Sequence, residues 1–298
     1  MLWPVRRSAR WLLLAVTIAV VMGASVTCGR GEDRPGIVTA EERGLTTSTT
    51  TTTETTMTKS AAPDVYQPRS DVAADQAVTA DVARLRTLLR RQAIDWAEAT
   101  AVWQQGPDRI ADVPEPVQRV DDALANRAGE PDDVRRTRAL HGLDVIIAVR
   151  IREELAEADA AMSTSGDGAA HDIDQARVYS QAAPALAAIE TLPAALGDGR
   201  AAAEEGDQAA FAAAAARIER ALEAFFYAAA LDALERDTSE AVRVAASETL
   251  YTAIAERVRS ELPDRHDAVV SAFADADADG LVVRRILGHA DLHRMFGE

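Results

Sequence analysis

From residue 70 to the end of the chain, apolar residues recur at intervals of three, four and seven positions, the spacing of one face of an α-helix. The pattern is clear in 70–105, where the apolar positions are Val78, Val82, Leu85, Leu89, Trp96 and Trp103. No stretch shows the sustained alternation of β-branched residues that is typical of a strand. The sequence therefore predicts an all-α fold, a bundle of about seven or eight helices without a sheet.

Glycine and proline residues divide this region into the predicted helices. A Gly-Pro pair at 106–107 ends the first helix, and Pro184 and Pro193 are expected to kink or break a later one. Ser163 to Gly168 is predicted as a flexible loop. We place helices at 70–105, 114–127, 132–162, 172–196, 207–234, 239–262, 264–274 and 281–296, and assign residues 70–298 to a single domain.

The N-terminal residues have the pattern of an export signal. Three arginines among the first ten residues precede an uncharged run from Trp11 to Thr27, which is short for a membrane span. We predict a signal peptide over 1–27. The only cysteine, Cys28, follows where a lipoprotein signal places its lipidated residue, so we predict lipidation there. Ordinary cleavage nearby is the alternative, because Ser25 and Thr27 differ from the residues usual at those positions.

A threonine-rich segment separates the signal from the helices. Residues 46–58 are almost entirely threonine and offer little apolar surface to bury. We therefore predict a disordered tether over 28–69 that begins at the lipidated Cys28. This layout is typical of an exported lipoprotein, anchored by its lipid to the outer face of the cytoplasmic membrane or to the cell surface.

The charge of the chain excludes some partners. Its formal net charge is −16, and removal of the three arginines in 1–27, which contain no acidic residue, makes it −19. Nucleic acid is therefore not expected as a partner. An acidic surface is compatible with the capture of metal cations, although the solubility of an exported domain is the simpler explanation of the charge.

Signatures of common enzymes are missing from the sequence. It contains no G-x-S-x-G, G-x-x-x-x-G-K or H-E-x-x-H motif and no dinucleotide glycine fingerprint. The Glu-x-x-His pair of di-iron bundles is also absent. We therefore expect a protein that is not an enzyme.

A histidine and an aspartate lie one turn apart in the third predicted helix. Asp144 shares an apolar face with Ile147 and Ile151, so its carboxylate is expected to be partly buried. A buried carboxylate needs a partner. His141, an arginine from another helix and a metal ion all remain open as that partner, and a buried hydrogen-bonded network is the ordinary alternative to a binding site.

A second group of candidate ligands lies further along the chain. Phe225-Phe226-Tyr227 is followed by Glu248 and Tyr251, a carboxylate and a phenol one turn apart on a predicted helix. Carboxylate and phenolate oxygens are hard ligands that suit ferric iron. The alternative is that these aromatic residues pack in the core and their hydroxyls form ordinary hydrogen bonds.

Two weaker patterns lie near the C-terminus. His289 and His293 have the spacing at which two imidazoles on a helix can bind one metal ion, although an exposed pair without a metal is the alternative. The segment from Asp275 to Gly280 imitates the first half of an EF-hand loop, but position twelve is Ile286 instead of glutamate. An acidic turn between helices is the simpler interpretation of that segment.

Two resemblances point to iron. The stretch 225–231, followed by Ala245, Glu248, Tyr251, Ile254 and Val258, resembles bacterial lipoproteins related to the algal iron-assimilating periplasmic protein. That resemblance implies a role in high-affinity iron uptake at the cell surface. A second resemblance is to imelysin-type helical domains, whose Gly-x-His-x-x-Glu motif aligns with Ala139 to Asp144, with Asp in place of Glu and Ala in place of Gly.

The sequence thus suggests a surface-anchored, non-enzymatic lipoprotein that binds iron or another metal cation for uptake or delivery. The candidate ligands or supporting residues are Glu248, Tyr251, His141 and Asp144, with Tyr227 behind them. The expected partners are the metal ion, the lipid anchor and an envelope protein such as a membrane permease. The alternative is an envelope-tethered helical scaffold for protein–protein interaction, which a large exposed apolar groove would indicate.

Overall fold

The computed structural model describes Pro68, Ile110 and residues 70–106, 114–163, 166–275 and 279–297. Residues Ala62–Glu298 form one compact unit, and all core residues that the structure describes lie within it, between Val72 and Phe296. The predicted signal peptide, Cys28 and nearly all of the predicted tether lie outside the described residues.

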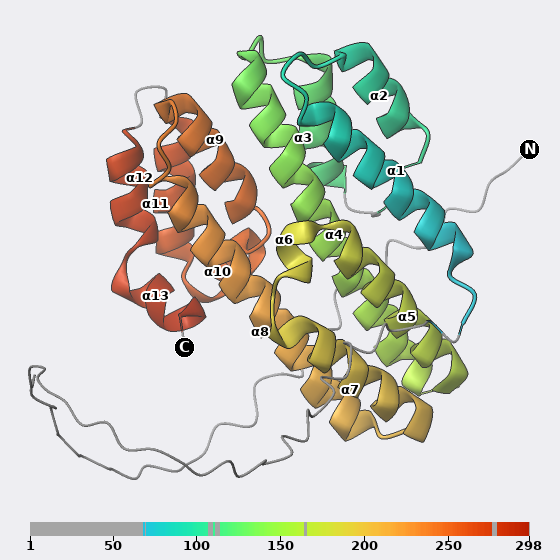
Figure 1. The fold of residues 1–298 in the computed structure, drawn as a ribbon. Helices are drawn as coiled ribbons and strands as arrows, with labels where there is room; N and C mark the ends of the chain where they lie inside the picture. The colour runs from blue at the N-terminus through green and yellow to red at the C-terminus, as the bar shows by residue number, and fades with distance from the viewer. Residues whose placement is uncertain are drawn as a thin grey trace, which may run out of the picture. The chain divides into compact units, whose positions relative to one another are not determined.

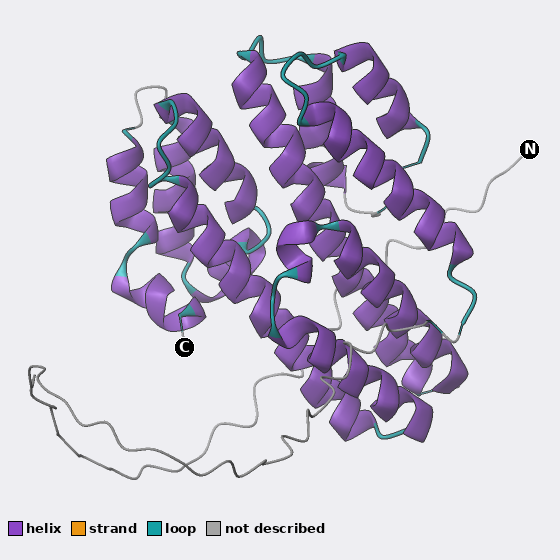
Figure 2. Cartoon of the chain, in the orientation of Figure 1, coloured by secondary structure: helices purple, strands orange, loops and turns teal. Residues whose placement is uncertain are grey.

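The described residues form helices and loops with no strand, which confirms the predicted all-α fold (Figure 2). Thirteen helices are described: α1 (Ala73–Leu89), α2 (Trp96–Gln104), α3 (Pro114–Ala125), α4 (Asp132–Met162), α5 (Gly166–Ala182), α6 (Pro184–Ala187), α7 (Thr191–Glu205), α8 (Gln208–Ala233), α9 (Glu240–Tyr251), α10 (Ala255–Glu261), α11 (Pro263–Ala274), α12 (Gly280–Leu287) and α13 (Ala290–Phe296).

The described helices outnumber the seven or eight predicted because four predicted helices are divided by breaks. The predicted helix over 70–105 stops at Leu89 and restarts at Trp96, where the Asp95 carboxylate accepts a hydrogen bond from the Glu98 backbone N–H at 2.9 Å. Pro184 is the first residue of α6, so the predicted helix over 172–196 is broken there, as expected for a proline. Pro193 lies in the first turn of α7 without interrupting it, because N–H groups in a first turn have no partner within the helix.

Two long helices organise the domain. Helix α4, with 31 residues, packs against α3, α5, α8 and α9, and α8, with 26 residues, packs against α7, α9 and α13. Figure 1 shows α9–α13 gathered on one side of the domain and α1–α7 on the other, with α8 running between the two groups. The core is filled by aliphatic side chains and a few large aromatic ones, among them Trp103, Phe211 and Phe226.

Helices α3 and α4 approach each other closely at Gly142. A Cβ atom built on Gly142 would lie 2.6 Å from Cγ2 of Val120, a distance that real Cβ contacts do not show. The glycine therefore allows α4 to lie directly against α3. In the part of the chain that the structure describes, no helix combines the length and apolar character needed to cross a membrane.

Candidate functional site

Asp144 finds its partner on another helix. Its side chain is 8% exposed, and its Oδ1 accepts a hydrogen bond of 2.7 Å from Nη2 of Arg86 on α1, whose side chain is 5% exposed. Nδ1 of His141 lies 3.6 Å from the other oxygen, which is beyond hydrogen-bonding distance. Of the three partners that the sequence left open, the structure shows the arginine, with the histidine beside the pair.

Glu248 on α9 lies between two arginines from other helices. Its Oε2 is 2.7 Å from Nη1 of Arg138 on α4, and its Oε1 is 3.4 Å from Nη1 of Arg119 on α3. Both carboxylate oxygens are thus already engaged by guanidinium groups. In this arrangement Glu248 ties α9 to α3 and α4.

The two candidate tyrosines have protein partners of their own. The Tyr251 hydroxyl lies 3.1 Å from Nδ1 of His266, and the Tyr227 hydroxyl donates to the backbone carbonyl of Leu287 at 3.1 Å. Burial raises the pKa of both phenols above the ordinary value. A phenol must lose its proton to bind ferric iron, so these surroundings oppose a ligand role.

The structure therefore brings together only two of the five predicted ligands, His141 and Asp144, and gives Glu248, Tyr251 and Tyr227 separate partners. Of the weaker patterns, His289 precedes α13, and its Nδ1 lies 3.1 Å from Oδ2 of Asp291. Residues 276–278 of the loop that resembles an EF-hand lie outside the described residues.

A different cluster, which includes the exposed Glu157, brings three carboxylates close enough together to hold a metal ion. Glu154 and Glu157 on α4 and Asp172 on α5 each offer one carboxylate oxygen, and these oxygens all lie within 4.8 Å of one another. The α4–α5 hairpin creates this arrangement, since its two antiparallel helices are joined by a short connection after Met162. The signal available in the sequence was the Glu-x-x-Glu spacing on α4, but the third carboxylate comes from the facing helix.

Glu154 is the most buried member of the cluster. Its side chain has no exposed surface; Arg150, one turn earlier on α4, forms an ion pair with its Oε1, whereas Oε2 has no hydrogen-bond partner among the described residues. Burial raises the pKa of Glu154 to about 8; Arg150 opposes this change, and the negative charges of Glu157 and Asp172 add to it. The folded domain therefore binds a proton on this carboxyl group more tightly than an exposed glutamate would.

Asp172 is affected by the same surroundings. Burial raises its pKa to about 6, and repulsion from Glu157 adds to the effect, while His171 and Arg150 partly oppose it. A cation placed among the three carboxylates would relieve this repulsion and supply a partner to the unpaired Oε2 of Glu154. Carboxylate oxygens are hard ligands, so the cluster suits hard cations such as iron, manganese, calcium or magnesium.

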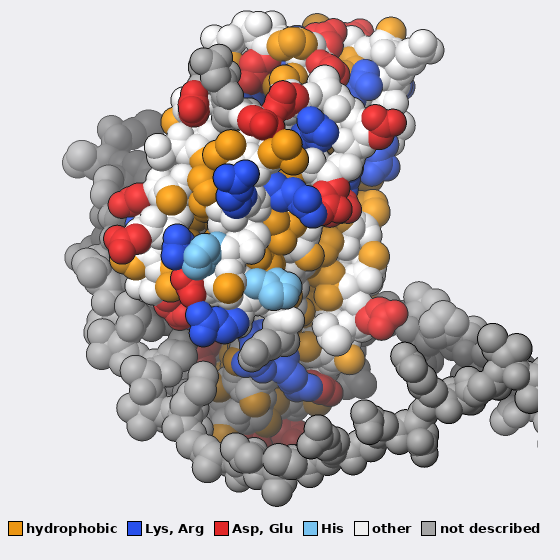
Figure 3. All heavy atoms as spheres, turned by 90° about the vertical axis from the view of Figure 1, so that its left-hand side faces the viewer, with side chains coloured by type: hydrophobic (Ala, Val, Ile, Leu, Met, Phe, Trp, Pro, Cys, Tyr) orange, Lys and Arg blue, Asp and Glu red, His pale blue; other side chains and the backbone are white. Residues whose placement is uncertain are grey.

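The scaffold alternative requires a large exposed apolar groove. Among the described residues, the large hydrophobic side chains that are exposed are Val270 on α11 and Leu281 and Val282 on α12. Figure 3 shows the face on the α11–α13 side of the domain, where hydrophobic side chains are interspersed with basic and acidic ones. Such an arrangement is typical of an ordinary protein surface rather than of a large apolar groove.

Comparison with protein-family models, with curated proteins and with solved structures found no match to this chain. The resemblances to iron-assimilating lipoproteins and to imelysin-type domains therefore stay predictions that rest on the residues quoted for them.

Proposed function

We propose that the helical domain binds a hard metal cation, with iron as the first candidate, between Glu154, Glu157 and Asp172. The observation that carries the proposal is the fully buried Glu154, whose Oε2 has no hydrogen-bond partner while two further carboxylates approach within 4.8 Å. A buried acceptor without a partner is costly, and a bound cation is the partner that three convergent carboxylates suit best.

Charge supports a cation rather than a neutral ligand. Two of the three carboxyl groups have raised pKa values, so the domain retains protons that a bound metal ion would displace. Arg150 supplies one positive charge against three carboxylates, which leaves an excess of negative charge once they ionise. Cation affinity should therefore rise with pH between about 5 and 8.

In this proposal the protein is a non-enzymatic lipoprotein that holds iron or a similar cation outside the cytoplasmic membrane for uptake or delivery to an envelope protein such as a permease. The export signal, lipidation at Cys28 and the tether belong to the proposal as sequence-based expectations. The ligands differ from those expected from the sequence, because Glu248, Asp144 and the two tyrosines already have protein partners.

Metal titration of the compact unit Ala62–Glu298 tests the site. The protein is first passed over a chelating resin and then titrated at pH 7.5 with Fe²⁺ under anaerobic conditions, and separately with Mn²⁺, Ca²⁺ and Tb³⁺. We expect one tight site for at least one of these ions, and a loss of affinity of at least tenfold in Glu154→Gln and in Asp172→Asn.

Two further variants make the result specific. Glu205→Gln removes the same charge from an exposed glutamate at the end of α7 and should leave binding unchanged. Glu248→Gln reports on a ligand expected from the sequence and should also leave it unchanged. Loss of binding in Glu248→Gln but not in Glu154→Gln would show that the cation binds at α9 instead of at the carboxylate cluster. Equally weak binding by all variants would contradict the proposal.

A further inference from the structure

Asp144 also lines a cavity that is rich in arginine side chains. It has a volume of about 380 Å³, and its lining comes from α1, α4, α6, the end of α8, α9 and the turn between α8 and α9. Four of its lining residues are arginines, namely Arg86, Arg90, Arg236 and Arg243, and the only acidic one is Asp144. This concentration of positive charge is unexpected in a chain whose net charge is −16.

Internal ion pairs neutralise only part of that charge. Arg86 pairs with Asp144, and Arg236 pairs with Asp232 at 3.0 Å. The guanidinium groups of Arg90 and Arg243 form no hydrogen bond or ion pair with another described residue, and Nε of Arg243 is buried without a partner. Two positive charges therefore face the cavity without a counter-charge from the described part of the chain.

Other polar side chains belong to the lining of the same cavity. Nε of Arg86 and Nδ1 of His141 are both buried without a hydrogen-bond partner among the described residues. The side chains of Thr137 and Thr238 also line the cavity, and the Thr137 hydroxyl donates to the Asp133 carbonyl at 2.8 Å. The hydrogen-bond donors of this cavity are thus chiefly its guanidinium groups, which are well suited to bind oxyanions.

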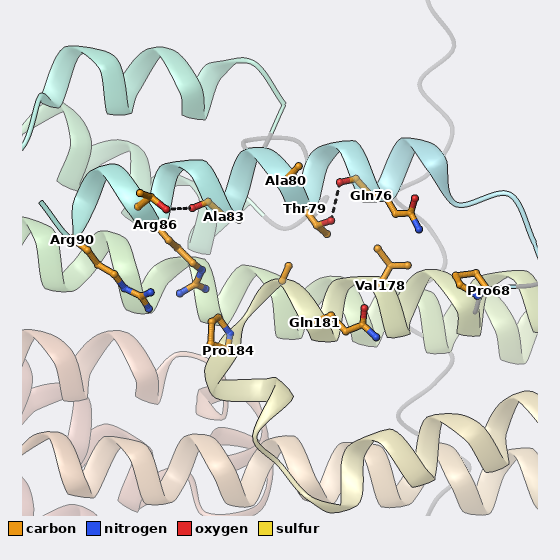
Figure 4. Close-up of a pocket in the computed structure, with 12 residues that line it drawn as sticks. Pro68, Gln76, Thr79, Ala80, Ala83, Arg86, Arg90, Val178, Gln181 and Pro184 are labelled. Carbon is orange, nitrogen blue, oxygen red and sulfur yellow. Dashed lines mark hydrogen bonds between the residues drawn. The ribbon is translucent and has the colours of Figure 1, made fainter. Parts of the chain in front are cut away.

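The arginines of α1 also connect this cavity to a second one. A space of about 490 Å³ between α1 and α5 shares Arg86, Arg90 and Pro184 with the arginine-lined cavity. Figure 4 shows both arginines extending from α1 toward Pro184, at the start of α6. The remaining lining of the second cavity is uncharged and includes Gln76, Thr79 and Gln181. A molecule bound by its anionic end at the arginines could thus extend a neutral polar part along α1.

We propose that the arginine-lined cavity binds a small organic molecule through a doubly charged oxyanion, of which a phosphate monoester is the best fit. Two unpaired guanidinium groups match a ligand charge of −2. Guanidinium groups also bind phosphate and carboxylate oxygens through pairs of parallel hydrogen bonds. The site shares no lining residue with the carboxylate cluster, so it is independent of the proposed cation site.

Isothermal titration of metal-free Ala62–Glu298 in a chloride buffer tests this site. The protein is treated with a chelating resin, because soluble chelators are themselves polyanions that would compete. Inorganic phosphate, sulfate, glycerol phosphate and succinate serve as separate probes. We expect saturable binding at one site. If the second cavity holds the neutral part of the ligand, glycerol phosphate should bind more tightly than inorganic phosphate. Tighter binding of succinate than of either phosphate would contradict the phosphate monoester and assign the site to dicarboxylates.

Variants that each remove one arginine, inside or outside the cavity, distinguish binding in the cavity from nonspecific attraction of the anion to positive charge. Arg90→Gln and Arg243→Gln should each weaken binding at least tenfold, and since Arg90 is exposed its loss should not disturb the fold. The control Arg285→Gln removes an exposed arginine of α12 that does not line the cavity and should leave affinity unchanged. Absence of saturable binding for all four probes, or an equal loss in the control, would overturn the proposal.

Discussion

At the scale of single residues, the pair of Arg86 and Asp144 has the largest consequence for stability. Both side chains are almost fully buried, so each charge depends on the other for compensation. Removing one partner of such a pair leaves an uncompensated charge in the interior, which usually costs more than the pair itself contributes.

We expect Arg86→Met to lower the free energy of unfolding by about 3 kcal/mol. The double variant Arg86→Met with Asp144→Leu should recover most of that loss, because it leaves no unpaired charge. Urea denaturation followed by circular dichroism measures both. The control is Arg84→Met on the same helix, where the arginine is 53% exposed and its loss should have little effect. If Arg86→Met and Arg84→Met lowered the free energy of unfolding equally, burial of the pair would not explain the loss.

The same residues show what the sequence could predict about the site. Burial of Asp144 followed from its place in an apolar stripe, and the need for a partner followed from burial. The identity of the partner did not, because Arg86 lies 58 positions away on another helix. The carboxylate cluster was missed for a similar reason: Glu154 and Glu157 are one turn apart on α4, but Asp172 reaches them only through the packing of α5.

At the scale of helices, the contact between α3 and α4 depends on the missing side chain of Gly142. Gly142→Ala should destabilise the domain by about 1–2 kcal/mol, since the new methyl group would meet the buried and stiff Val120. In a Val120→Ala background the same substitution should instead be stabilising, because alanine favours a helix over glycine by about 1 kcal/mol. Thermal unfolding of the four proteins gives the comparison, and the same sign in both backgrounds would contradict it.

Helix boundaries show a limit of periodicity. Helix α4 has the bounds that the sequence predicted, 132–162, since Pro131 precedes it and its apolar pattern is continuous. The helix predicted over 239–262 instead divides at residues 252–254, where neither glycine nor proline occurs. At the break the Ala253 carbonyl accepts a hydrogen bond of 2.9 Å from Nη1 of Arg152 on α4, and α10 packs on α11; the spacing of apolar residues encodes neither contact.

At the scale of the whole domain, the raised pKa values make stability depend on pH. Glu154, whose folded pKa is about 8, and Asp172, at about 6, bind protons more tightly in the folded than in the unfolded chain. Folding is therefore favoured at low pH by these groups, and their contribution is lost as the pH rises toward 8. Glu223, whose pKa burial also raises, acts in the same direction, whereas the lowered pKa of His266 acts in the opposite one.

We expect the metal-free domain to lose stability relative to Glu154→Gln as the pH rises from 5 to 8, by an amount on the order of 3 kcal/mol. The difference between the two proteins isolates Glu154 from the other titrating groups. Urea unfolding at four pH values measures it. Saturation with the bound cation should remove the trend in the wild-type chain, because the metal ion binds the deprotonated carboxylates. A difference that does not vary with pH would show that Glu154 keeps an ordinary affinity for its proton.

Because α4 is continuous, it fixes the distance between the two proposed binding sites. Asp144, beside the arginine-lined cavity, and Glu154, in the carboxylate cluster, are ten positions apart on one unbroken helix, which corresponds to about 15 Å along its axis. A paramagnetic ion such as Mn²⁺ held at the cluster should therefore shorten the ³¹P relaxation time of a phosphate ester bound at the arginines. Shortened ³¹P relaxation would show that the metal ion and the phosphate ester are bound to the same protein molecule at the same time, without any label attached to the protein.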